Sequence, residues 1–341
     1  MVAQKHKSVS VKDVAEHSGT SLGTVSRVLN GSASVSAGAR ERVEKAIEEL
    51  GYAPNAGARQ MRSGRSGLVG ILLPSLDVPF FGILAQALEQ ALFEHGYHCL
   101  ICNTEENEDH ERRYVSTLIS QKVDGIIAAA VMTTKNFGRL ADEAIPIVAV
   151  DRSPDGKAED LVSVDHREGG RLIARHLLRL GHRRISVVGA PTHSTPIALR
   201  IEGIREVLGK HEIKPIQIIL GNEHSFDSCF ELARRVLEKE PPTALIGLTD
   251  IAAIGAIHAA HERGLRIPQD ISVIGFDNLP QSAHIYPTLT TVDQPITLLG
   301  QLAARDLLYR IDPKRFSKPD LSVLSLRIVE RDSTGPAPEV S

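Results

Sequence analysis

From Leu68 onward, short apolar runs alternate with longer stretches in which apolar residues recur at helical spacing. Eight of these runs have the length and composition of buried strands. Strands that alternate with helices form parallel sheets covered by helices on both faces. About 260 residues of this alternation are too many for one sheet, so the pattern predicts two doubly wound α/β lobes. The expected strands are 68–73, 98–102, 125–130, 147–150, 185–188, 216–220, 244–248 and 271–275.

Helix-length patterns separate most of these strands. Ligands of such sheets bind at the carboxyl ends of the strands, and several polar side chains follow strands here. They are Ser75, Asp77, Asp151, Arg152, Asp250, Asp277 and Asn278. The expected helices are 81–95, 108–121, 167–180, 198–211, 226–240 and 251–263.

The first 54 residues follow a different, all-α pattern. Two short helices meet at a tight turn, Gly19-Thr20, and Ser10 with Asp13 forms a capping-box pattern at the first. Ser21 is expected to cap the second helix and Ser36 to cap a third that ends at Gly51. Three short helices on one small core predict a helix-turn-helix head.

Small and polar side chains line the outer face of the second helix, with Arg27 at its far end. Such a helix fits the major groove of duplex DNA. The chain carries a net charge of -3, but residues 1–66 hold ten Lys and Arg against six acids, and the remainder carries -7. A basic head on an acidic body concentrates the attraction for phosphates at these helices.

Other classes of protein find little support in the sequence. No apolar run approaches the roughly 18 residues that span a bilayer, and no signal-peptide pattern appears, so a cytoplasmic location is expected. Cys99 and Cys102 lie three apart on a strand, and with Cys229 they fit a reducing compartment. No phosphate loop, zinc spacing or nucleophile elbow is present, so no enzyme activity, cofactor or metal is expected.

Several motifs then occur in a fixed order. They are Asp13-Val-Ala, Thr24-Val-Ser-Arg-Val-Leu-Asn30, Tyr52-Ala-Pro-Asn55, Asp151-Arg, Arg200-Ile-Glu-Gly, Asp270-Ile-Ser-Val-Ile-Gly-Phe-Asp-Asn278 and Leu289-Thr-Thr-Val-Asp-Gln294. With these motifs in this order, the chain resembles the LacI/GalR family of transcription regulators over about residues 8–331. The resemblance implies a repressor that binds palindromic operator DNA as a homodimer. Its body would resemble type I periplasmic sugar-binding proteins.

On the DNA side, the resemblance implies two groups of contact residues. Residues 55–66 match the family's hinge helix, in which an apolar side chain wedges into the minor groove; Met61 takes that position here. Because methionine is unbranched and flexible, it would define the kink less sharply. The implied DNA-binding residues are Ser10, Ser21, Leu22, Gly23, Thr24, Arg27, Asn30, Asn55, Ala58 and Met61.

On the effector side, the resemblance implies a cleft between two lobes that binds a sugar, a sugar acid or a sugar phosphate. A purine is disfavoured, because Ser194 and Pro196 replace the Arg and Thr of purine-binding relatives. His193 and His224 could add positive charge for an acidic sugar. The effector acts as inducer in the family's usual case and as co-repressor in others. The implied effector-binding residues are Ser75, Phe80, Asp151, Arg200, His224, Asp250, Asp277 and Gln294.

The resemblance also sets expected boundaries. Residues 1–54 form the DNA-binding head, 55–66 the hinge helix and linker, 67–331 the effector-binding and dimerisation body, and 332–341 a frayed tail. Lobe one would comprise about 67–164 plus 295–323, and lobe two about 165–294 plus 324–331. A secreted sugar-binding protein is the remaining alternative, but a signal peptide would have to replace the head.

Overall fold

A computed structural model describes residues 9–29, 34–52, 65–129, 133–152, 161–189, 194–238, 241–321 and 324–339. The chain divides into two compact units, Met1–Ser66 and Gly67–Ser341. Asn30 and most of the expected hinge helix, with Asn55, Ala58 and Met61, lie outside the described residues.

The first unit contains three helices, α1 (Val11–Ser18), α2 (Leu22–Leu29) and α3 (Ala37–Leu50), around a small apolar core. The Ser10–Asp13 capping box forms as expected, and Gly19 ends α1 in the left-handed region with φ 60°. The Ser21 hydroxyl accepts the Thr24 N–H at 3.1 Å, as expected of a cap. Ser36 takes the position before α3, but its side chain makes no capping hydrogen bond. The core residues are Val14, Ala15, Val25, Val28, Val43, Ala46 and Tyr52.

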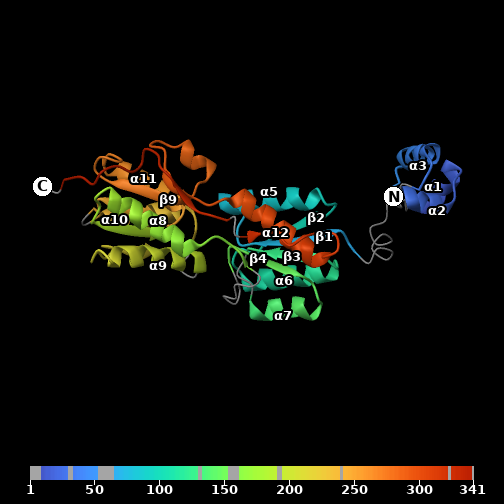
Figure 1. The fold of residues 1–341 in the computed structure, drawn as a ribbon, viewed down its shortest axis with the longest axis horizontal. Coiled ribbons are helices and arrows are strands. Elements are labelled where there is room, and N and C mark those ends of the chain that lie inside the picture. Colours follow the sequence, from blue (N-terminus) through green and yellow to red (C-terminus); the bar gives the residue numbers. More distant parts are fainter. Residues whose placement is uncertain are drawn as a thin grey trace, which may run out of the picture. The chain divides into compact units, whose positions relative to one another are not determined.

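Lobe one of the second unit is a parallel five-stranded sheet of order β2-β1-β3-β4-β5 (Figure 1). Its strands are β1 (Leu68–Leu73), β2 (His98–Asn103), β3 (Gly125–Ala128), β4 (Ile147–Val150) and β5 (Leu161–Val162). Helices α5 (Pro79–Phe93) and α12 (Ile296–Ile311) pack on one face of the sheet. Helices α6 (Glu108–Ser120) and α7 (Thr134–Asp142) cover the other face.

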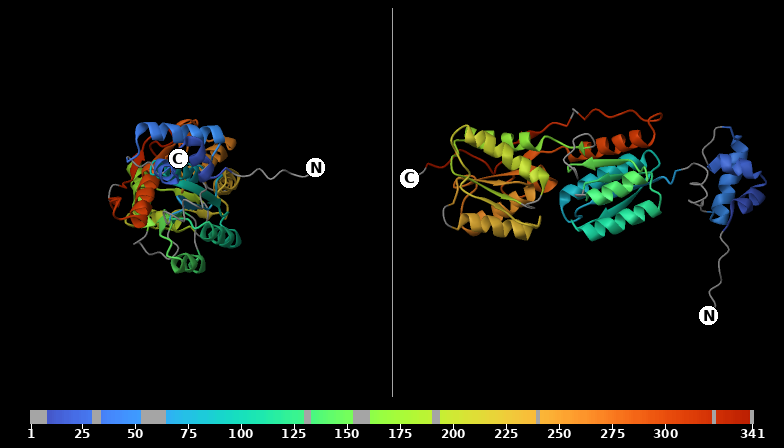
Figure 2. Two further views of the ribbon diagram at one scale, coloured as in Figure 1. Left: turned by 90° about the vertical axis from the view of Figure 1, so that its right-hand side faces the viewer. Right: turned by 90° about the horizontal axis from the view of Figure 1, so that it is seen from below.

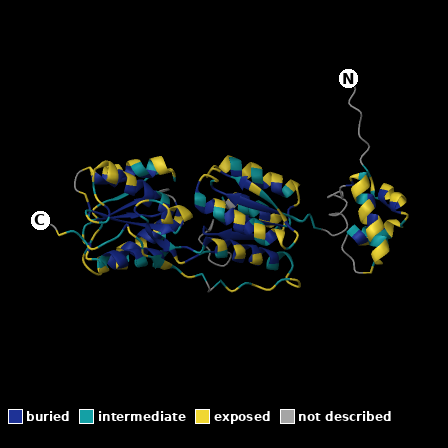
Figure 3. Cartoon of the chain, turned by 90° about the horizontal axis from the view of Figure 1, so that it is seen from above, coloured by how far each residue is buried: buried dark blue, intermediate teal, exposed yellow. Residues whose placement is uncertain are grey.

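Lobe two is a six-stranded sheet of order β11-β10-β9-β8-β6-β7. Its strands are β6 (Ile185–Gly189), β7 (Ile218–Leu220), β8 (Ala244–Gly247), β9 (Ser272–Asp277), β10 (Thr290–Asp293) and β11 (Arg327–Val329). Helices α8 (His166–Arg179) and α9 (Thr195–Gly209) cover one face. Helices α10 (Phe226–Leu237) and α11 (Asp250–Glu262) cover the other. A short 3-10 helix, η2 (Pro280–Ala283), follows β9. Figure 3 shows the buried sheets between helices whose outer faces are exposed.

The chain passes between the two lobes three times, after β5, after β10 and after α12 (Figure 2). Helix α12 therefore packs against α5 of lobe one although more than 200 residues separate them. Strand β11 returns to lobe two and pairs antiparallel with β10. Each lobe is built from two separate stretches of the sequence.

The expectation of a frayed tail from residue 332 is wrong for residues 333–337. Ser333 is fully buried, and its backbone pairs with Val273 and Thr288 at 2.8 and 3.0 Å. The Ala337 N–H donates to the Leu180 carbonyl at 2.8 Å. These bonds satisfy buried backbone groups at the end of the sheet, and they anchor the tail to lobe two.

Close contact between α8 and α9 organises lobe two. A Cβ added to Gly170 of α8 would lie 2.0 Å from the carbonyl oxygen of Arg200, and one added to Gly203 of α9 would lie 1.9 Å from that of Arg167. The two helices can approach this closely only because both positions are glycine. This packing fixes the backbone of Arg200.

Candidate functional site

The exposed start of α2 carries the first candidate site. Leu22 is 47% exposed although it is large and apolar. Arg27 is exposed one turn further along the helix, and an added Cβ at Gly23 would meet only ordinary contacts at 3.6 Å or more. The sequence-predicted residues Ser10, Ser21, Leu22, Gly23, Thr24 and Arg27 all belong to α1, α2 or their caps, and the side chains of Val25 and Val28 form the buried face of α2. The outer face of α2 is therefore free to enter a groove.

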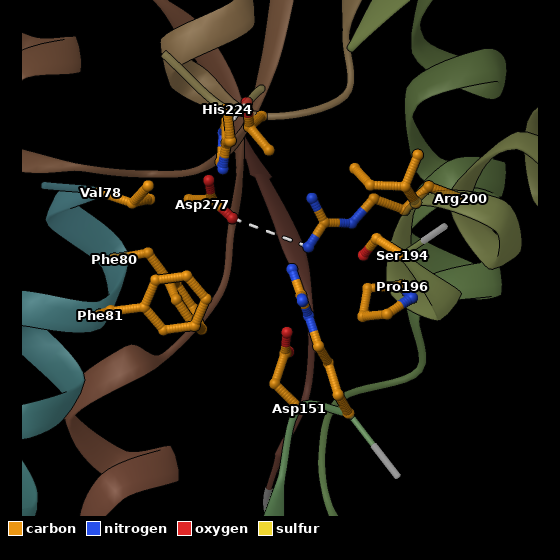
Figure 4. Close-up of a pocket in the computed structure, with 12 residues that line it drawn as sticks. Val78, Phe80, Phe81, Asp151, Ser194, Pro196, Arg200, His224 and Asp277 are labelled. Carbon is orange, nitrogen blue, oxygen red and sulfur yellow. Dashed lines mark hydrogen bonds and ion pairs between the residues drawn. The ribbon is translucent and has the colours of Figure 1, made fainter. Parts of the chain in front are cut away.

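The second candidate site lies where the lobes meet, at the carboxyl ends of β4 and β9 (Figure 4). A cavity of about 30 Å³, called here the inner chamber, remains between the side chains. That space holds roughly two water molecules. Its lining residues are Val78, Phe80, Phe81, Asp151, Arg152, Ser194, Pro196, Ile197, Arg200, His224, Thr249 and Asp277.

Arg200, on α9, is the central cation of the inner chamber and is only 3% exposed. Its guanidinium lies over the ring of Phe276, 3.5 Å from the ring centroid, which is a desolvated cation–π contact. One nitrogen donates to the Leu248 carbonyl at 2.5 Å. Another lies 3.7 Å from the Asp277 carboxylate. Burial lowers the pKa of Arg200, and the carboxylates of Asp277 and Asp151 oppose that shift.

A hydrogen-bonded chain runs from Arg200 to lobe one. The Arg200 guanidinium donates to Nδ1 of His166 at 3.3 Å, so this nitrogen is an acceptor and His166 is neutral. Nε2 of His166 then donates to Asp151 at 2.9 Å, and the Gln294 amide donates to the same oxygen at 2.9 Å. Burial lowers the pKa of His166, in accord with a neutral ring. Burial alone would raise the pKa of Asp151, but its hydrogen bond from His166 and the charges of Arg200 and Arg152 lower the pKa.

The two carboxylates of the inner chamber stand on strained backbone. Asp151 has φ 63° and Asp277 has φ 121°. Residues other than glycine rarely adopt such angles, which cost of order 1–3 kcal/mol each. Burial, with the nearby carboxylates of Asp250 and Asp151, raises the pKa of Asp277 well above its usual range, against the attraction of Arg200. Strained, buried carboxylates in a cavity are typical of a binding site.

A larger cavity of about 350 Å³, called here the outer chamber, adjoins the inner one. Both chambers are lined by Val78, Phe81, Arg152 and His224. The outer chamber is further lined by Pro74, Ser75, Asp77, Asn103, Glu105, Glu106, Asn222, Glu223 and Ser225.

Most of the predicted effector-binding residues line these two chambers. Phe80, Asp151, Arg200, His224 and Asp277 line the inner chamber, and Ser75 lines the outer one. Burial lowers the pKa of His224 to about 4, so its ring is neutral at pH 7 and does not supply the positive charge considered for an acidic sugar.

Asp250 and Gln294 line neither chamber, and each side chain is hydrogen-bonded to a neighbouring element. The Asp250 carboxylate accepts from the Leu279 N–H at 2.7 Å, the Ser282 hydroxyl at 2.6 Å and the Thr291 hydroxyl at 2.5 Å. It is fully buried, and it holds the turn that follows Asp277 at the end of β9. Gln294 instead donates its amide N–H to Asp151 and accepts from Arg200 at 3.4 Å.

Sequence reasoning placed Arg152 at a strand end but left it out of the effector-binding set, and it did not mark Phe81 or His166. Phe81 and Arg152 line both chambers, and His166 joins Arg200 to Asp151. Arg152 directly follows Asp151 at the end of β4, so its place at a strand end was the available signal. Nothing in the local pattern marks His166, because its function depends on a contact across 34 residues of sequence.

The described part of the chain shows neither a metal-binding cluster nor a membrane-spanning helix. Within it, no three His, Cys, Asp or Glu side chains gather in a way that could hold a metal ion. No described helix is both long enough and apolar enough to cross a membrane.

Comparisons with known proteins identify the family to which both units belong. Residues 10–55 match the family model for bacterial regulatory proteins of the lacI family, and residues 66–327 match that for periplasmic binding proteins and the sugar binding domain of the LacI family. The ribose operon repressor of Halalkalibacterium halodurans is 37% identical over 307 residues, which cover 89% of this chain and 91% of that protein.

Two solved structures are similar over most or all of their length. The lac repressor dimer bound to operator and the anti-inducer ONPF has a TM-score of 0.83 at 32% identity, covering 96% of this chain and 100% of that one. A LacI family regulator from Enterococcus faecium with bound ribose has a TM-score of 0.70 at 31% identity, covering 79% of this chain and 99% of that one. The chain therefore belongs to the LacI family of bacterial transcriptional regulators, which are not enzymes but DNA-binding repressors controlled by a small-molecule effector.

Proposed function

We propose that the effector is a sugar-like polyol that binds in the cleft between the lobes. The observation that carries this proposal is the buried guanidinium of Arg200, flanked by Asp277 and Asp151 and facing Phe80 across the inner chamber. Forked charged groups beside an aromatic face suit vicinal hydroxyls. The ribose named for a relative and bound to a similar regulator supports the same class of ligand.

The size of the inner chamber supports a coupling mechanism. A sugar ring does not fit in a space of about 30 Å³, so binding must displace lining side chains or move the lobes. The chain from Arg200 through His166 to Asp151 links lobe two to lobe one at this point. A ligand that competes for these groups binds one arrangement of the lobes more tightly than another. This difference in affinity shifts the equilibrium between the arrangements.

On the DNA side, we propose that a homodimer places two copies of α2 in successive major grooves of a palindromic operator. Leu22, Gly23, Thr24 and Arg27 would face bases, and Ser10, Ser21 and Asn30 phosphates. A hinge segment at 55–66, with Asn55, Ala58 and Met61, would contact the minor groove, and the effector would control whether it orders. DNA binding and three free cysteines are consistent with a cytoplasmic protein.

Binding of a fluorescent palindromic duplex, with and without sugars, tests this proposal. We expect tight binding to one palindrome and at least a tenfold change in affinity with the effector, a coupling of about 1.4 kcal/mol. Arg200→Ala should keep operator affinity but lose the response to sugar, because the pocket loses its main cation. Arg234→Ala, an exposed position on α10, is the matched control. If the response survives in Arg200→Ala, the effector binds elsewhere.

A further inference from the structure

Two buried polar atoms next to the outer chamber have no hydrogen-bond partner among the described residues. They are Nε of Arg152 and Oδ1 of Asn103, and both residues line the outer chamber. The Arg152 side chain is only 7% exposed. Buried polar groups are nearly always paired. Arg152 Nε therefore lacks an acceptor and Asn103 Oδ1 lacks a donor, and a ligand can supply both.

The charges around the outer chamber are mostly negative. Asp77, Glu105, Glu106 and Glu223 line it, together with Arg152. The Arg152 guanidinium already donates to Glu106 at 2.7 Å, so its charge is offset. His224 lines the same chamber and is neutral at pH 7, because burial lowers its pKa to about 4. The described lining therefore repels anions.

The unpaired atoms and the charge specify complementary features of a ligand. Hydroxyl groups can both accept, as Arg152 Nε requires, and donate, as Asn103 Oδ1 requires, whereas a phosphate or carboxylate oxygen only accepts. An anion in this chamber would also lose hydration and lie beside several carboxylates, and both effects disfavour its binding.

We propose that the outer chamber is a second effector subsite that takes an uncharged, hydroxyl-bearing part of the sugar and rejects phosphate and carboxylate groups. This inference rests on the proposed function, since it assumes a sugar in the cleft. It narrows the effector from three candidate classes to neutral sugars.

Calorimetric titration of the full-length protein with matched probes tests the inference. The probes are D-ribose and D-ribose 5-phosphate, D-glucose, D-glucose 6-phosphate and D-glucuronate, and the neutral disaccharide cellobiose. We expect at least one neutral sugar to bind, and to bind at least tenfold more tightly than its anionic counterparts. The preference should shrink as salt is raised, because salt screens the repulsion in this open chamber.

A double variant, Glu105→Gln with Glu223→Gln, locates the source of the preference. It should reduce the discrimination against the anionic sugar severalfold, while Glu231→Gln, an exposed acid on α10, should leave it unchanged. Neutral preference that persists in the double variant overturns the inference, because the chamber would not be its source. Anionic sugars that bind as tightly as neutral ones also overturn it, but they leave the proposed function intact. If none of the six probes binds, the inference fails together with the choice of a sugar effector.

Discussion

The two candidate sites are built in opposite ways. Within the described residues, the candidate DNA-binding surface takes its side chains from a single stretch, Ser10 to Arg27, on the outside of two helices. The effector site gathers side chains from α5, α8, α9, β4, β9 and the loops that follow, and nearly all are buried. The difference shows that a surface can be read from local periodicity, whereas a cleft depends on packing between distant segments. The two units should therefore respond differently to substitution.

Glycine substitutions in helices should show the largest contrast. Gly170→Ala places a methyl group 2.0 Å from the Arg200 carbonyl oxygen, so α8 and α9 must separate. We expect the body to lose more than about 3 kcal/mol of stability. Gly38→Ala in α3, where an added Cβ meets nothing closer than 3.9 Å, should be neutral or stabilise the head by up to about 1 kcal/mol. Thermal unfolding followed by circular dichroism measures both, and equal effects would contradict the contrast.

Removal of the Asp250 carboxylate should have the next largest effect. Asp250→Ala leaves three buried donors without an acceptor, and we expect a loss of about 2–4 kcal/mol in urea unfolding. Asp77→Ala, at the exposed rim of the outer chamber, should cost less than about 0.5 kcal/mol. A stable Asp250→Ala protein that has lost only ligand affinity would restore Asp250 to the effector site.

In the head, a surface substitution should change binding and not stability. Arg27 is exposed on α2, so Arg27→Ala should weaken operator binding by about 1–3 kcal/mol and leave the melting temperature of the head unchanged. Lys45→Ala, an exposed position on α3, is the control. Fluorescence anisotropy with specific and scrambled duplexes distinguishes the two: a loss confined to the operator indicates base contact, and an equal loss on both indicates a phosphate contact.

Acidification should produce the smallest of these contrasts, a modest loss of stability in the body and little change in the head. Burial lowers the pKa values of His166, His176, His182 and His224 in the body. The unfolded chain therefore binds more protons than the native body as pH falls from 7.5 to 5.5, and the body loses stability. Asp250, whose pKa burial raises to about 6, opposes this loss, but four histidines act in the other direction.

The head should change little over the same range. Its one resolved shift among described residues is Glu49, whose pKa is lowered by its hydrogen bond with His17, and that effect is lost only below its ordinary value of 4.5. Calorimetric scans at pH 7.5 and 5.5 measure the two transitions, and His182→Gln should reduce the pH dependence of the body. A larger shift in the melting temperature of the head than in that of the body would contradict this prediction.

Much of the fold was accessible because its signals are local. The expected strands at 68–73 and 147–150 coincide with β1 and β4, and capping by Ser10 and Ser21 is confirmed. Strand β10 was missed because Thr290 and Thr291 look polar, yet both side chains are buried and hydrogen-bonded. Helix α12 was missed as an element, and the tail was expected to fray, because both depend on contacts with segments far away in the chain.

The sequence by itself determined the three-helix head, the alternating body and the chemistry available at the strand ends. Helical and strand periodicity, caps and turns act within a few residues, so they can be recognised without the rest of the chain. Only the tertiary structure decided that Asp250 faces the turn after β9 while Arg152 faces the cavity, and that His166 joins Arg200 to Asp151. A buried polar group must find a partner, and which partner lies within reach is set by how the lobes pack.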